Sequence, residues 1–453
     1  MMMIAEAARA LGSPWDHPDR AISAVVTDSR AMKPGALFFA LRGERFDAHA
    51  FLDDVARQQA IAAVVEKGWA ETHRFAPLPV IPVEDTRLAL GSLASFWRQK
   101  FSIPLVAVTG SNGKTTVKEM LASIAGAASG GAGVLATSGN LNNDIGMPLT
   151  LLRLSDKDRY AIIEMGMNHP GELTYLSKLA RPTAALINNA QAAHLEGLGS
   201  VENIARAKGE ILQGLGEDGI AVLNADDPSI AMWRGLAGTR RVITFAIEAA
   251  ADVVGSPTAE RLEIQLPDQL ISVSLQVPGL HNARNAVAAT AAAYAVGIDK
   301  ASIVEGLESF RGVKGRLQLK RGLEGARFID DSYNANPDST KAAISVLAAE
   351  PGKRVLVLGD MGELGANAAA LHREVGAFAK AAGIDALLAL GELSIHSVQG
   401  FGKQAMHFER MEELLAELHN LLAPDVTVLV KGSRFMQMER VVKSFADDTG
   451  KES

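Results

Sequence analysis

One stretch constrains this sequence more than any other: a glycine-rich loop that directly follows a short apolar run. Residues 105–108, Leu-Val-Ala-Val, are typical of a buried strand and continue into Thr-Gly-Ser-Asn-Gly-Lys-Thr-Thr at 109–116. A helical pattern from Thr115 to about Ala125 follows. Strand, glycine turn and helix in this order gather backbone N–H groups and a helix N-terminus around one point, which suits a phosphate chain. The sequence therefore predicts an α/β fold that binds ATP at this loop.

The residue types within the loop fit a triphosphate. Gly110 and Gly113 permit the turn, Lys114 offers a positive charge for the β- and γ-phosphates, and Thr115 offers a hydroxyl to Mg²⁺. The spacing G-x-x-G-K-T is shorter than that of the common P-loop, and a capped turn with a solvent-facing lysine is the alternative. We predict that the whole loop contacts ATP: Gly110, Ser111, Asn112, Gly113, Lys114, Thr115 and Thr116.

Length and composition narrow the class of protein. A chain of 453 residues exceeds the roughly 250 to 300 residues at which one core stops growing. The formal net charge of −7 argues against a nucleic-acid partner, and no apolar stretch of roughly 18 residues suggests a membrane span. The absence of Cys excludes thiolate chemistry and fits a reducing compartment. We expect a cytoplasmic protein that is a monomer.

Three domains are expected from the strand and helix patterns. Residues 1–84 alternate short apolar runs with helical stretches, as in a small α/β domain. Residues 85–311 hold the glycine loop and further buried runs, for which parallel βαβ topology is the natural prediction. After the basic, glycine-rich residues 311–316 the alternation restarts, and residues 312–453 are predicted to form a Rossmann-like α/β domain.

Three residues of the central domain are candidates for a magnesium site. Glu164 closes the apolar run 160–163, and a carboxylate at the end of a strand beside the loop suits Mg²⁺, although a salt-bridge role is the alternative. His194 follows another run and could equally be structural. Lys208 lies in the helical stretch 201–215, where its pattern alone indicates a solvated face.

Four further polar residues are ambiguous by themselves. Asn282 and Asn285 begin an Ala-rich helical stretch and could be a cap and a polar face. Arg316 and Asp331, near the start of the third domain, allow the same reading. Local pattern alone assigns none of them a role.

Together these pieces resemble the Mur ligase family, ATP-dependent amide-forming enzymes that build the peptide stem of bacterial peptidoglycan. The resemblance covers nearly the whole chain. Its motifs occur in order as Thr27–Arg30 (TDSR), Pro34–Phe38 (PGALF), Gly43–His49 (GERFDAH), Gly139–Gly146 (GNLNNDIG), Asp331–Pro337 (DSYNANP), Gly359–Gly365 (GDMGELG) and Lys431–Arg434 (KGSR). Within the family, these motifs are most similar to the branch that joins D-Ala-D-Ala to UDP-N-acetylmuramoyl-tripeptide.

The resemblance implies roles for the ambiguous residues. It assigns Lys114 and Thr115 to ATP phosphate and Mg²⁺, and Glu164 and His194 to the metal. It places a carbamylated lysine at Lys208, a change that turns a cation into an anionic oxygen ligand for Mg²⁺. The other ATP contacts that it implies are Asn282 and Asn285 with the base, Arg316 with the phosphates and Asp331 with the ribose. The catalytic residues that it implies are Lys114, Lys208, His194 and Arg316.

The resemblance also implies the substrates, their contacts and the chemistry. The first domain would bind the UDP end, the third the dipeptide, and a carboxylate would attack the γ-phosphorus to give an acyl phosphate. The implied substrate contacts are Ser29, Arg30, Gly43, Phe46, Asp47, His49, Asn140, Asn142, Asn143, Asn334, Asn336, Lys431, Ser433 and Arg434. The sequence leaves open whether the third stem residue is meso-diaminopimelate or lysine, and which group deprotonates the incoming amine.

Three rivals share part of the pattern. A sibling ligase that adds the third amino acid is expected to carry a D-N-P-R motif in its third domain. This chain lacks that motif and has Gly359–Gly365 in its place. A folylpolyglutamate synthetase shares the ATP domain but needs no UDP-binding first domain. A nucleotide-controlled switch could use the loop alone, yet it would have no need for Glu164, His194 and Lys208 around it.

Overall fold

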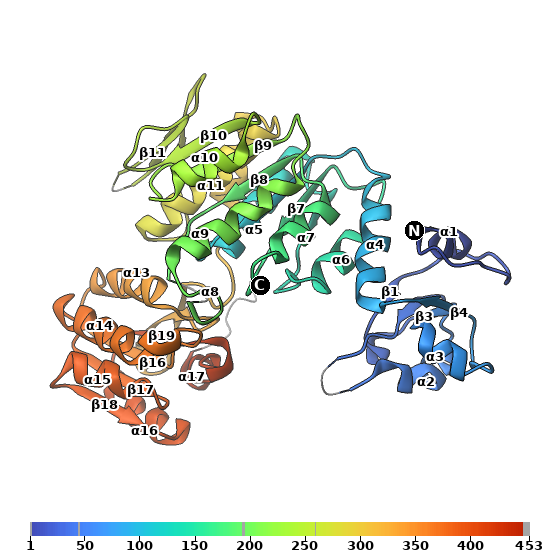
Figure 1. Cartoon of the computed structure of the whole chain (residues 1–453). Helices are drawn as coiled ribbons and strands as arrows, with labels where there is room; N and C mark the ends of the chain where they lie inside the picture. Colours follow the sequence, from blue (N-terminus) through green and yellow to red (C-terminus); the bar gives the residue numbers. More distant parts are fainter. Residues whose placement is uncertain (1, 44–45, 193–194, 259, 447–453) are drawn as a thin grey trace.

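The computed structural model describes residues 2–43, 46–192, 195–258 and 260–446, and it contains three sheets that follow one another along the chain (Figure 1). Each sheet lies within one of the three predicted domain ranges, so the three-domain α/β fold is confirmed. The boundaries 1–84, 85–311 and 312–453 stay predictions. Among the described residues, no helix is long and apolar enough to cross a membrane.

The first sheet has four parallel strands in the order β1-β2-β3-β4. Its elements are α1 (Ile4–Ala10), β1 (Val25–Val26), β2 (Leu37–Phe39), α2 (Leu52–Arg57), β3 (Ala62–Glu66), α3 (Lys67–Thr72) and β4 (Val80–Val83). Strands β2 and β3 are buried along almost their whole length because helices and the next unit cover them. Short 3-10 turns at Ser29–Ala31 and Ala48–Phe51 carry two of the predicted substrate motifs.

Helix α4 (Thr86–Arg98) joins the first unit to the second (Figure 1). It begins at Asp85, whose side chain accepts hydrogen bonds from the backbone N–H groups of Arg87 and Leu88. Its buried face packs against α1 and β3 on one side and against α6 (Gly146–Leu151) and α7 (Glu172–Ala180) on the other. One apolar cluster therefore runs without interruption from the first sheet through α4 into the second unit.

The central sheet has nine strands in the order β13-β12-β11-β10-β9-β8-β5-β7-β6. The strands are β5 (Leu105–Thr109), β6 (Val134–Ala136), β7 (Tyr160–Glu164), β8 (Ala184–Ile187), β9 (Ile220–Asn224), β10 (Arg241–Ala246), β11 (Val253–Pro257), β12 (Leu262–Gln265) and β13 (Leu270–Val273). From β6 to β11 neighbours are parallel, as predicted, but β11, β12 and β13 form an antiparallel extension that the sequence analysis did not foresee.

The helices of the central unit cover both faces of this sheet (Figure 1). They are α5 (Lys114–Ala128), α6, α7, α8 (Leu195–Leu198), α9 (Val201–Gly209), α10 (Ile230–Ala237), α11 (Leu280–Ala295) and α12 (Lys300–Ser309). The α-helix predicted over 201–215 ends at Gly209 and continues as a 3-10 helix, Glu210–Gly214. Strand β5 lies between β7 and β8, with Val108 opposite Glu164 and Thr109 opposite Ile187, so the three strands end together.

The third sheet has six strands in the order β14-β15-β19-β16-β17-β18, with only β14 antiparallel to its neighbour. Its elements are β14 (Gln318–Arg321), β15 (Arg327–Asp331), α13 (Pro337–Ala348), β16 (Lys353–Gly359), α14 (Ala368–Ala381), β17 (Ala386–Leu390), α15 (Ile395–Phe401), β18 (Ala405–Phe408), α16 (Met411–Leu421), β19 (Val426–Lys431) and α17 (Glu439–Phe445). Its two faces bury separate apolar clusters that include no residue of the first two units.

Candidate active site

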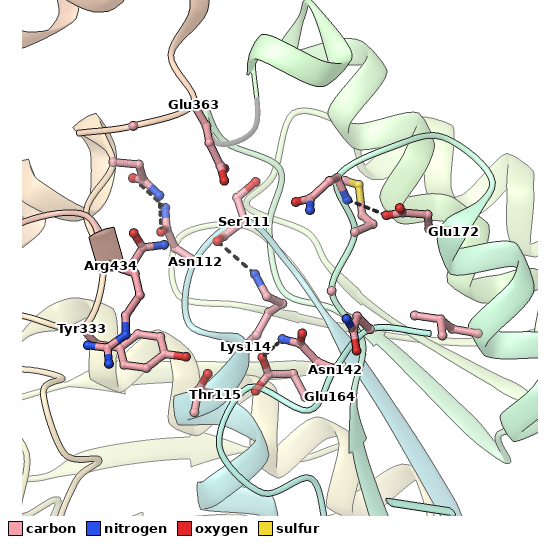
Figure 2. A pocket seen from close by; sticks show the side chains of 18 of the residues that line it. Ser111, Asn112, Lys114, Thr115, Asn142, Glu164, Glu172, Tyr333, Glu363 and Arg434 are labelled. Atoms are coloured by element: carbon pink, nitrogen blue, oxygen red, sulfur yellow. Dashed lines mark hydrogen bonds between the residues drawn. The ribbon is translucent and has the colours of Figure 1, made fainter. Parts of the chain in front are cut away.

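A cavity of about 960 Å³ lies where the second and third units meet, and three parts of the chain line it. The glycine loop supplies one wall, the ends of β7 and its neighbours supply another, and loops of the third unit supply the last (Figure 2). The predicted site residues that line it are Ser111, Asn112, Gly113, Lys114, Thr115, Asn142, Asn143, Glu164, Arg316, Asn334, Asn336, Ser433 and Arg434. The structure thus brings together residues more than 300 positions apart in sequence.

The loop is built around two glycines that accept no side chain. Gly113 has φ +79° and precedes the first residue of α5, and a Cβ there would lie 2.3 Å from Asn285 Oδ1. A Cβ on Gly110 would lie 2.9 Å from Asn188 Cβ. The loop is therefore pressed against the residues that follow β8 and against α11.

Asparagines after β8 fix the loop by hydrogen bonds. The backbone N–H of Asn112 donates to Asn189 Oδ1 at 2.9 Å, and its carbonyl accepts from Asn188 Nδ2 at 2.9 Å. Ser111 Oγ donates to the Gln191 carbonyl at 3.0 Å. These hydrogen bonds to neighbouring residues satisfy polar groups of the turn and fix the shape of the loop.

Lys114, the first residue of α5, turns back over the loop. Its Nζ donates to the carbonyl oxygens of Gly110 at 2.6 Å and Ser111 at 3.3 Å. Burial lowers the pKa of Lys114, while the carboxylates of Glu164 and Glu363 act in the opposite direction. The ammonium is held at the point where the loop opens into the cavity.

Glu164 ends β7 beside the loop and carries an unused oxygen. Its Oε1 accepts from Asn142 Nδ2 at 2.7 Å, but its Oε2 is buried with no hydrogen-bond partner among the described residues (Figure 2). A buried carboxylate oxygen without a partner is costly unless a cation or donor arrives. Within the described chain no group of three His, Asp or Glu residues converges on a metal position, and His194 lies outside the described residues.

Lys208 is almost fully buried in α9, with 1% of its surface exposed, so the solvated face suggested by its pattern is wrong. Burial, and next the positive charge of Lys114, lower its pKa well below the usual range. No hydrogen bond or ion pair to its ammonium is found in the part of the chain that the structure describes. Helix α9 therefore presents an unpaired amine near the Lys114 side of the site.

The third unit reaches the loop through Asn336, which caps α13. Asn336 Nδ2 donates to Asn112 Oδ1 at 2.8 Å, and Asn112 Nδ2 lies 3.4 Å from Asn336 Oδ1. The Arg316 guanidinium stacks on the Tyr333 ring at 4.4 Å, and that of Arg434 lies 5.7 Å from the same ring. Two positive charges thus enter the cavity on one aromatic support.

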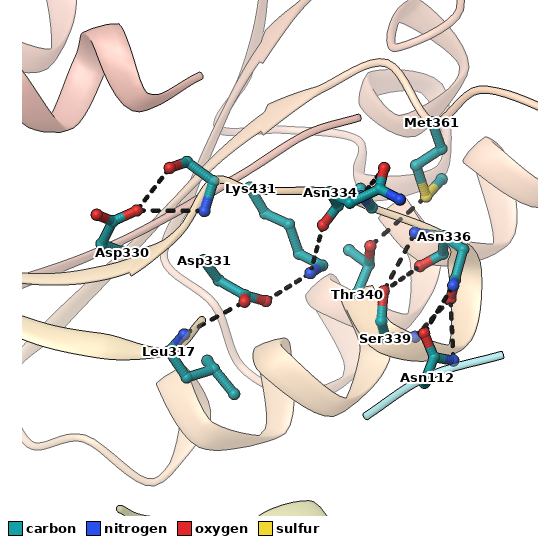
Figure 3. A network of polar contacts seen from close by, with 12 residues as sticks. Asn112, Leu317, Asp330, Asp331, Asn334, Asn336, Ser339, Thr340, Met361 and Lys431 are labelled. Atoms are coloured by element: carbon teal, nitrogen blue, oxygen red, sulfur yellow. Dashed lines mark hydrogen bonds and ion pairs between the residues drawn. The ribbon is translucent and has the colours of Figure 1, made fainter. Parts of the chain in front are cut away.

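Asp331 and Lys431 form a buried pair within the third unit (Figure 3). Lys431 Nζ lies 2.5 Å from Asp331 Oδ2 and donates to the Asn334 carbonyl at 3.0 Å, while Asp331 Oδ1 accepts from the Leu317 N–H at 3.2 Å. The Lys431 ammonium is engaged by these partners and Lys431 does not line the cavity, and its contact with substrate stays a prediction. Asp331 is likewise occupied at both oxygens and does not line the cavity.

The two asparagines of α11 are buried at 6% exposure each, outside the cavity lining. Asn282 Nδ2 donates to the Pro278 carbonyl at 2.7 Å, and Asn285 Oδ1 accepts from Asn188 Nδ2 at 3.1 Å. Between them and the third unit lies His281, whose buried Nε2 has no partner among the described residues. Burial lowers the pKa of His281 to about 4, against the opposite influence of Asp331.

The predicted substrate residues of the first unit lie apart from the cavity. Arg30 is exposed and pairs with Asp28, Phe46 is 66% exposed, and Asp47 pairs with Arg42. His49 is only 4% exposed, and its ring contacts Asp47 Oδ1 at 2.5 Å and the Glu66 N–H at 3.0 Å. Both ring nitrogens of His49 therefore have partners within the first unit, and its contact with substrate stays a prediction.

The remaining predicted residues are placed as follows. Asn140 is exposed and outside the lining, and Asn143 Oδ1 caps α6 by accepting from the Gly146 N–H at 2.8 Å. The Gly43 N–H donates to the Phe46 carbonyl at 3.0 Å. Ser433 Oγ accepts from the Gly362 N–H at 2.8 Å. Thr116, in the first turn of α5, lies outside the lining.

Sequence reasoning missed several lining residues: Arg87, Asp144, Glu172, Tyr175, Tyr333 and Glu363. Asp144, Tyr333 and Glu363 lie inside the family motifs, and that position was the available signal. Arg87, Glu172 and Tyr175 come from helices whose faces toward the cavity no local pattern reveals.

A strand-loop-helix phosphate site closed by a further α/β unit defines the class of ATP-dependent, multidomain ligases. Family models match in three consecutive parts: "Mur ligase family, catalytic domain" over residues 21–98, "Mur ligase middle domain" over 108–293, and "Mur ligase, glutamate ligase domain" over 315–434. The chain belongs to the Mur ligase family and is an ATP-dependent, peptide-forming ligase.

The chain is also similar to individual Mur ligases over almost its full length. The chain is 44% identical to UDP-N-acetylmuramoyl-tripeptide--D-alanyl-D-alanine ligase of Escherichia coli K12, over 95% of each chain. It superimposes on the UDP-N-acetylmuramoylalanyl-D-glutamyl-2,6-diaminopimelate--D-alanyl-D-alanyl ligase of Acinetobacter baumannii with TM-score 0.85 and 36% identity, covering 97% of each chain. The MurF ligase of Thermotoga maritima in complex with ADP gives TM-score 0.82 at 29% identity, over 93% of this chain and 96% of that one.

Proposed function

We propose that this protein joins D-Ala-D-Ala to the terminal carboxylate of UDP-N-acetylmuramoyl-tripeptide, with ATP converted to ADP and phosphate in peptidoglycan precursor synthesis. The observation that carries the proposal is the shared cavity. The ATP loop, with Lys114, and the third-unit motif residues Asn334, Asn336 and Arg434 line one volume. The names of the relatives supply the same pair of substrates. We assign 2,6-diaminopimelate, printed in the name of the Acinetobacter relative, to the third stem residue here.

The first step brings two anions together, and the cavity supplies positive charge for it. Lys114 at the loop and Arg316 across the cavity are the cations that would neutralise the γ-phosphate as the carboxylate attacks it. The attack forms a carbon–oxygen–phosphorus linkage, the acyl phosphate, and releases ADP. The dipeptide amine then attacks the acyl carbon and releases phosphate. Closure of the third unit over the loop would keep water from the acyl phosphate in the interval.

Residues around Glu164 fit a magnesium ion. The buried Glu164 Oε2 has no described hydrogen-bond partner, and Thr115, with its hydroxyl, lines the same cavity, so both offer oxygen to a hard cation. Bound there, Mg²⁺ would supply charge neutralisation to the phosphates. Lys208, buried and without a partner among the described residues, fits the proposed carbamate, which would add an anionic oxygen ligand. His194 keeps its predicted metal role as a proposal.

The dipeptide would enter from the third unit. Arg434 is exposed to the cavity beside Tyr333, where a guanidinium can pair with the terminal carboxylate of D-Ala-D-Ala. Asn334 and Asn336 offer amide groups on the same side. Ser29, Arg30, Phe46 and Asp47 of the first unit are left for the UDP end.

Setting and organisation complete the proposal. We place the reaction in the cytoplasm, where a chain with 0 Cys and no membrane-spanning helix among its described residues can work. We expect a monomer with domains at 1–84, 85–311 and 312–453, and no nucleic-acid partner.

A substrate panel tests the proposal. Release of ADP and phosphate should require both UDP-N-acetylmuramoyl-tripeptide and D-Ala-D-Ala, and mass spectrometry should find the UDP-pentapeptide. Turnover of a UDP-dipeptide with a free diamino acid, and none with D-Ala-D-Ala, would identify the sibling activity and refute the proposal.

A further inference from the structure

The cavity has an end that the proposed chemistry leaves unused, formed where the first and second units join. Arg87 and Leu88 from the first turn of α4 line it, together with Asp144 and Tyr175. Met167 adds an apolar surface nearby in the lining. This end therefore combines one cation, one anion and apolar side chains.

Arg87 and Asp144 form an ion pair across the junction. Arg87 Nη2 donates to Asp144 Oδ1 at 2.8 Å, and Nε contacts Oδ2. The Arg87 side chain remains 55% exposed and that of Asp144 29% exposed. The Asp85 cap holds the backbone of Arg87, and Tyr175 lies against Gly91 one turn further along α4. The backbone that carries Arg87 is thus held in place, while the charged groups of the pair remain accessible.

The pair keeps spare hydrogen-bonding capacity. A guanidinium has five N–H donors, and the Nη1 group of Arg87 has no partner among the described residues. A carboxylate accepts more bonds than the two that Asp144 receives. The side chains can therefore bind a ligand that carries both a negative and a positive group without parting from one another.

The other cations that line the cavity are differently placed. Lys114 is bonded to its own loop, and Arg316 and Arg434 stack on Tyr333 in the third unit. Among the described residues, Arg87 is the cation that lines the cavity from α4, the helix that joins the first unit to the second. A second carboxylate of the tripeptide substrate would meet its partner here.

Sequence proximity puts the pair close to the reacting end of the tripeptide. Asp144 is two residues from Asn142, whose side chain holds Glu164 at the proposed metal position. Two residues span at most about 7 Å of chain. A diaminopimelate side chain has three methylenes and then a carbon with an ammonium and a carboxylate, so its head extends several ångströms from the reacting carboxylate.

We propose that Arg87 and Asp144 determine specificity for the third stem residue by binding the distal zwitterion of diaminopimelate. Arg87 pairs with the distal carboxylate, Asp144 with the distal ammonium, and Leu88 and Met167 contact the methylenes. This inference rests on the proposed function. Lysine is diaminopimelate without the distal carboxylate, so a lysine tripeptide forfeits the contact with Arg87 and keeps that with Asp144.

The test compares kcat/KM for two UDP-tripeptides that differ only in the third residue, meso-diaminopimelate or L-lysine, with ATP and D-Ala-D-Ala saturating. The unaltered protein should prefer diaminopimelate by about tenfold, the size of one exposed charge-assisted contact. Arg87→Ala should lose that factor on diaminopimelate and change less than about twofold on lysine. Arg87→Lys should keep part of the preference, and Asp144→Asn should weaken both substrates alike.

A matched control is Arg153→Ala, which removes an exposed arginine of the same unit that donates to Ser138 Oγ. It should leave the preference unchanged. If Arg87→Ala reduces both substrates equally, the pair only joins the two units and the inference is wrong. A preference for lysine in the unaltered protein would overturn it too. If neither tripeptide is turned over, the proposed function itself fails.

Discussion

Lys208 in α9 and Lys431 at the end of β19 are each 1% exposed, yet their surroundings differ. Lys431 has a carboxylate, Asp331, and a backbone carbonyl within hydrogen-bond distance. Lys208 has neither among the described residues, and its charged neighbour is another lysine, Lys114. Burial lowers the pKa of both amines, but only at Lys431 does an anion oppose this effect.

The difference fits a structural role for Lys431 and the proposed reactive role for Lys208. The buried Lys431 ammonium is paired with a carboxylate, so it contributes to the structure of the third unit. A buried amine without one is favoured in its neutral form, and a neutral amine can combine with CO₂ to give a carbamate. The comparison therefore supports the carbamate at Lys208 and explains why a motif lysine, Lys431, does not reach the cavity.

The largest effect should follow from removing the reactive partner of this comparison. Lys208→Ala should lower kcat by roughly a hundred- to a thousandfold, the range seen when one charge-stabilising group is lost. Added formate or acetate should restore part of the rate by replacing the carbamate oxygens. The control is Lys178→Ala, on an exposed position of α7, which should leave the rate unchanged. Near-normal activity of Lys208→Ala would remove the basis for the carbamate.

The structural partner is tested by Asp331→Asn, which leaves the Lys431 charge buried without its carboxylate. It should destabilise the third unit by about 3 kcal/mol. The 4 Trp residues, Trp15, Trp69, Trp97 and Trp233, all precede that unit. Urea unfolding should therefore shift when followed by circular dichroism and stay unchanged by tryptophan fluorescence. The double change Asp331→Leu with Lys431→Met should regain most of the loss, and no shift in the single variant would contradict a buried ion pair.

The smallest effect concerns His281, which lies near the Asp331–Lys431 pair at the junction of the second and third units. Burial lowers its pKa to about 4, whereas the unfolded chain binds a proton near 6.5. Stability is thus complete above pH 6.5 and is lost as the pH falls toward 4, by about 2 kcal/mol after allowance for partial exposure. Thermal melts from pH 7 to 4 should show His281→Asn losing less than the unaltered protein.

The sequence was sufficient where one local pattern determines the structure. The loop at 109–116, with its strand before and helix after, was predicted because glycine spacing and hydrophobic periodicity are local properties. The antiparallel strands β11, β12 and β13 were missed because each is short and pairs with its neighbour rather than following a helix. Strand order in the central sheet likewise depends on packing that no window of sequence contains.

Site residues were predictable as members of motifs, but not in their orientation. His49 and Lys431 both belong to motifs, yet each is turned inward to satisfy a carboxylate, Asp47 and Asp331 respectively. Whether a polar side chain faces a cavity or a neighbour depends on burial, which arises only when each unit folds. The ion pair of Arg87 with Asp144 spans 57 positions and was invisible for the same reason.

The continuous apolar cluster through α4 links the position of the first unit to that of the second. Parting the first two units would expose that cluster to water, whereas the third unit meets the loop through polar contacts such as Asn112 with Asn336. A change in the distance between the first-unit loops and the glycine loop therefore carries a hydrophobic cost that a movement of the third unit does not. If the first unit binds the UDP end of the substrate, as proposed, a peptide stem that is one residue too short would leave its carboxylate away from the glycine loop.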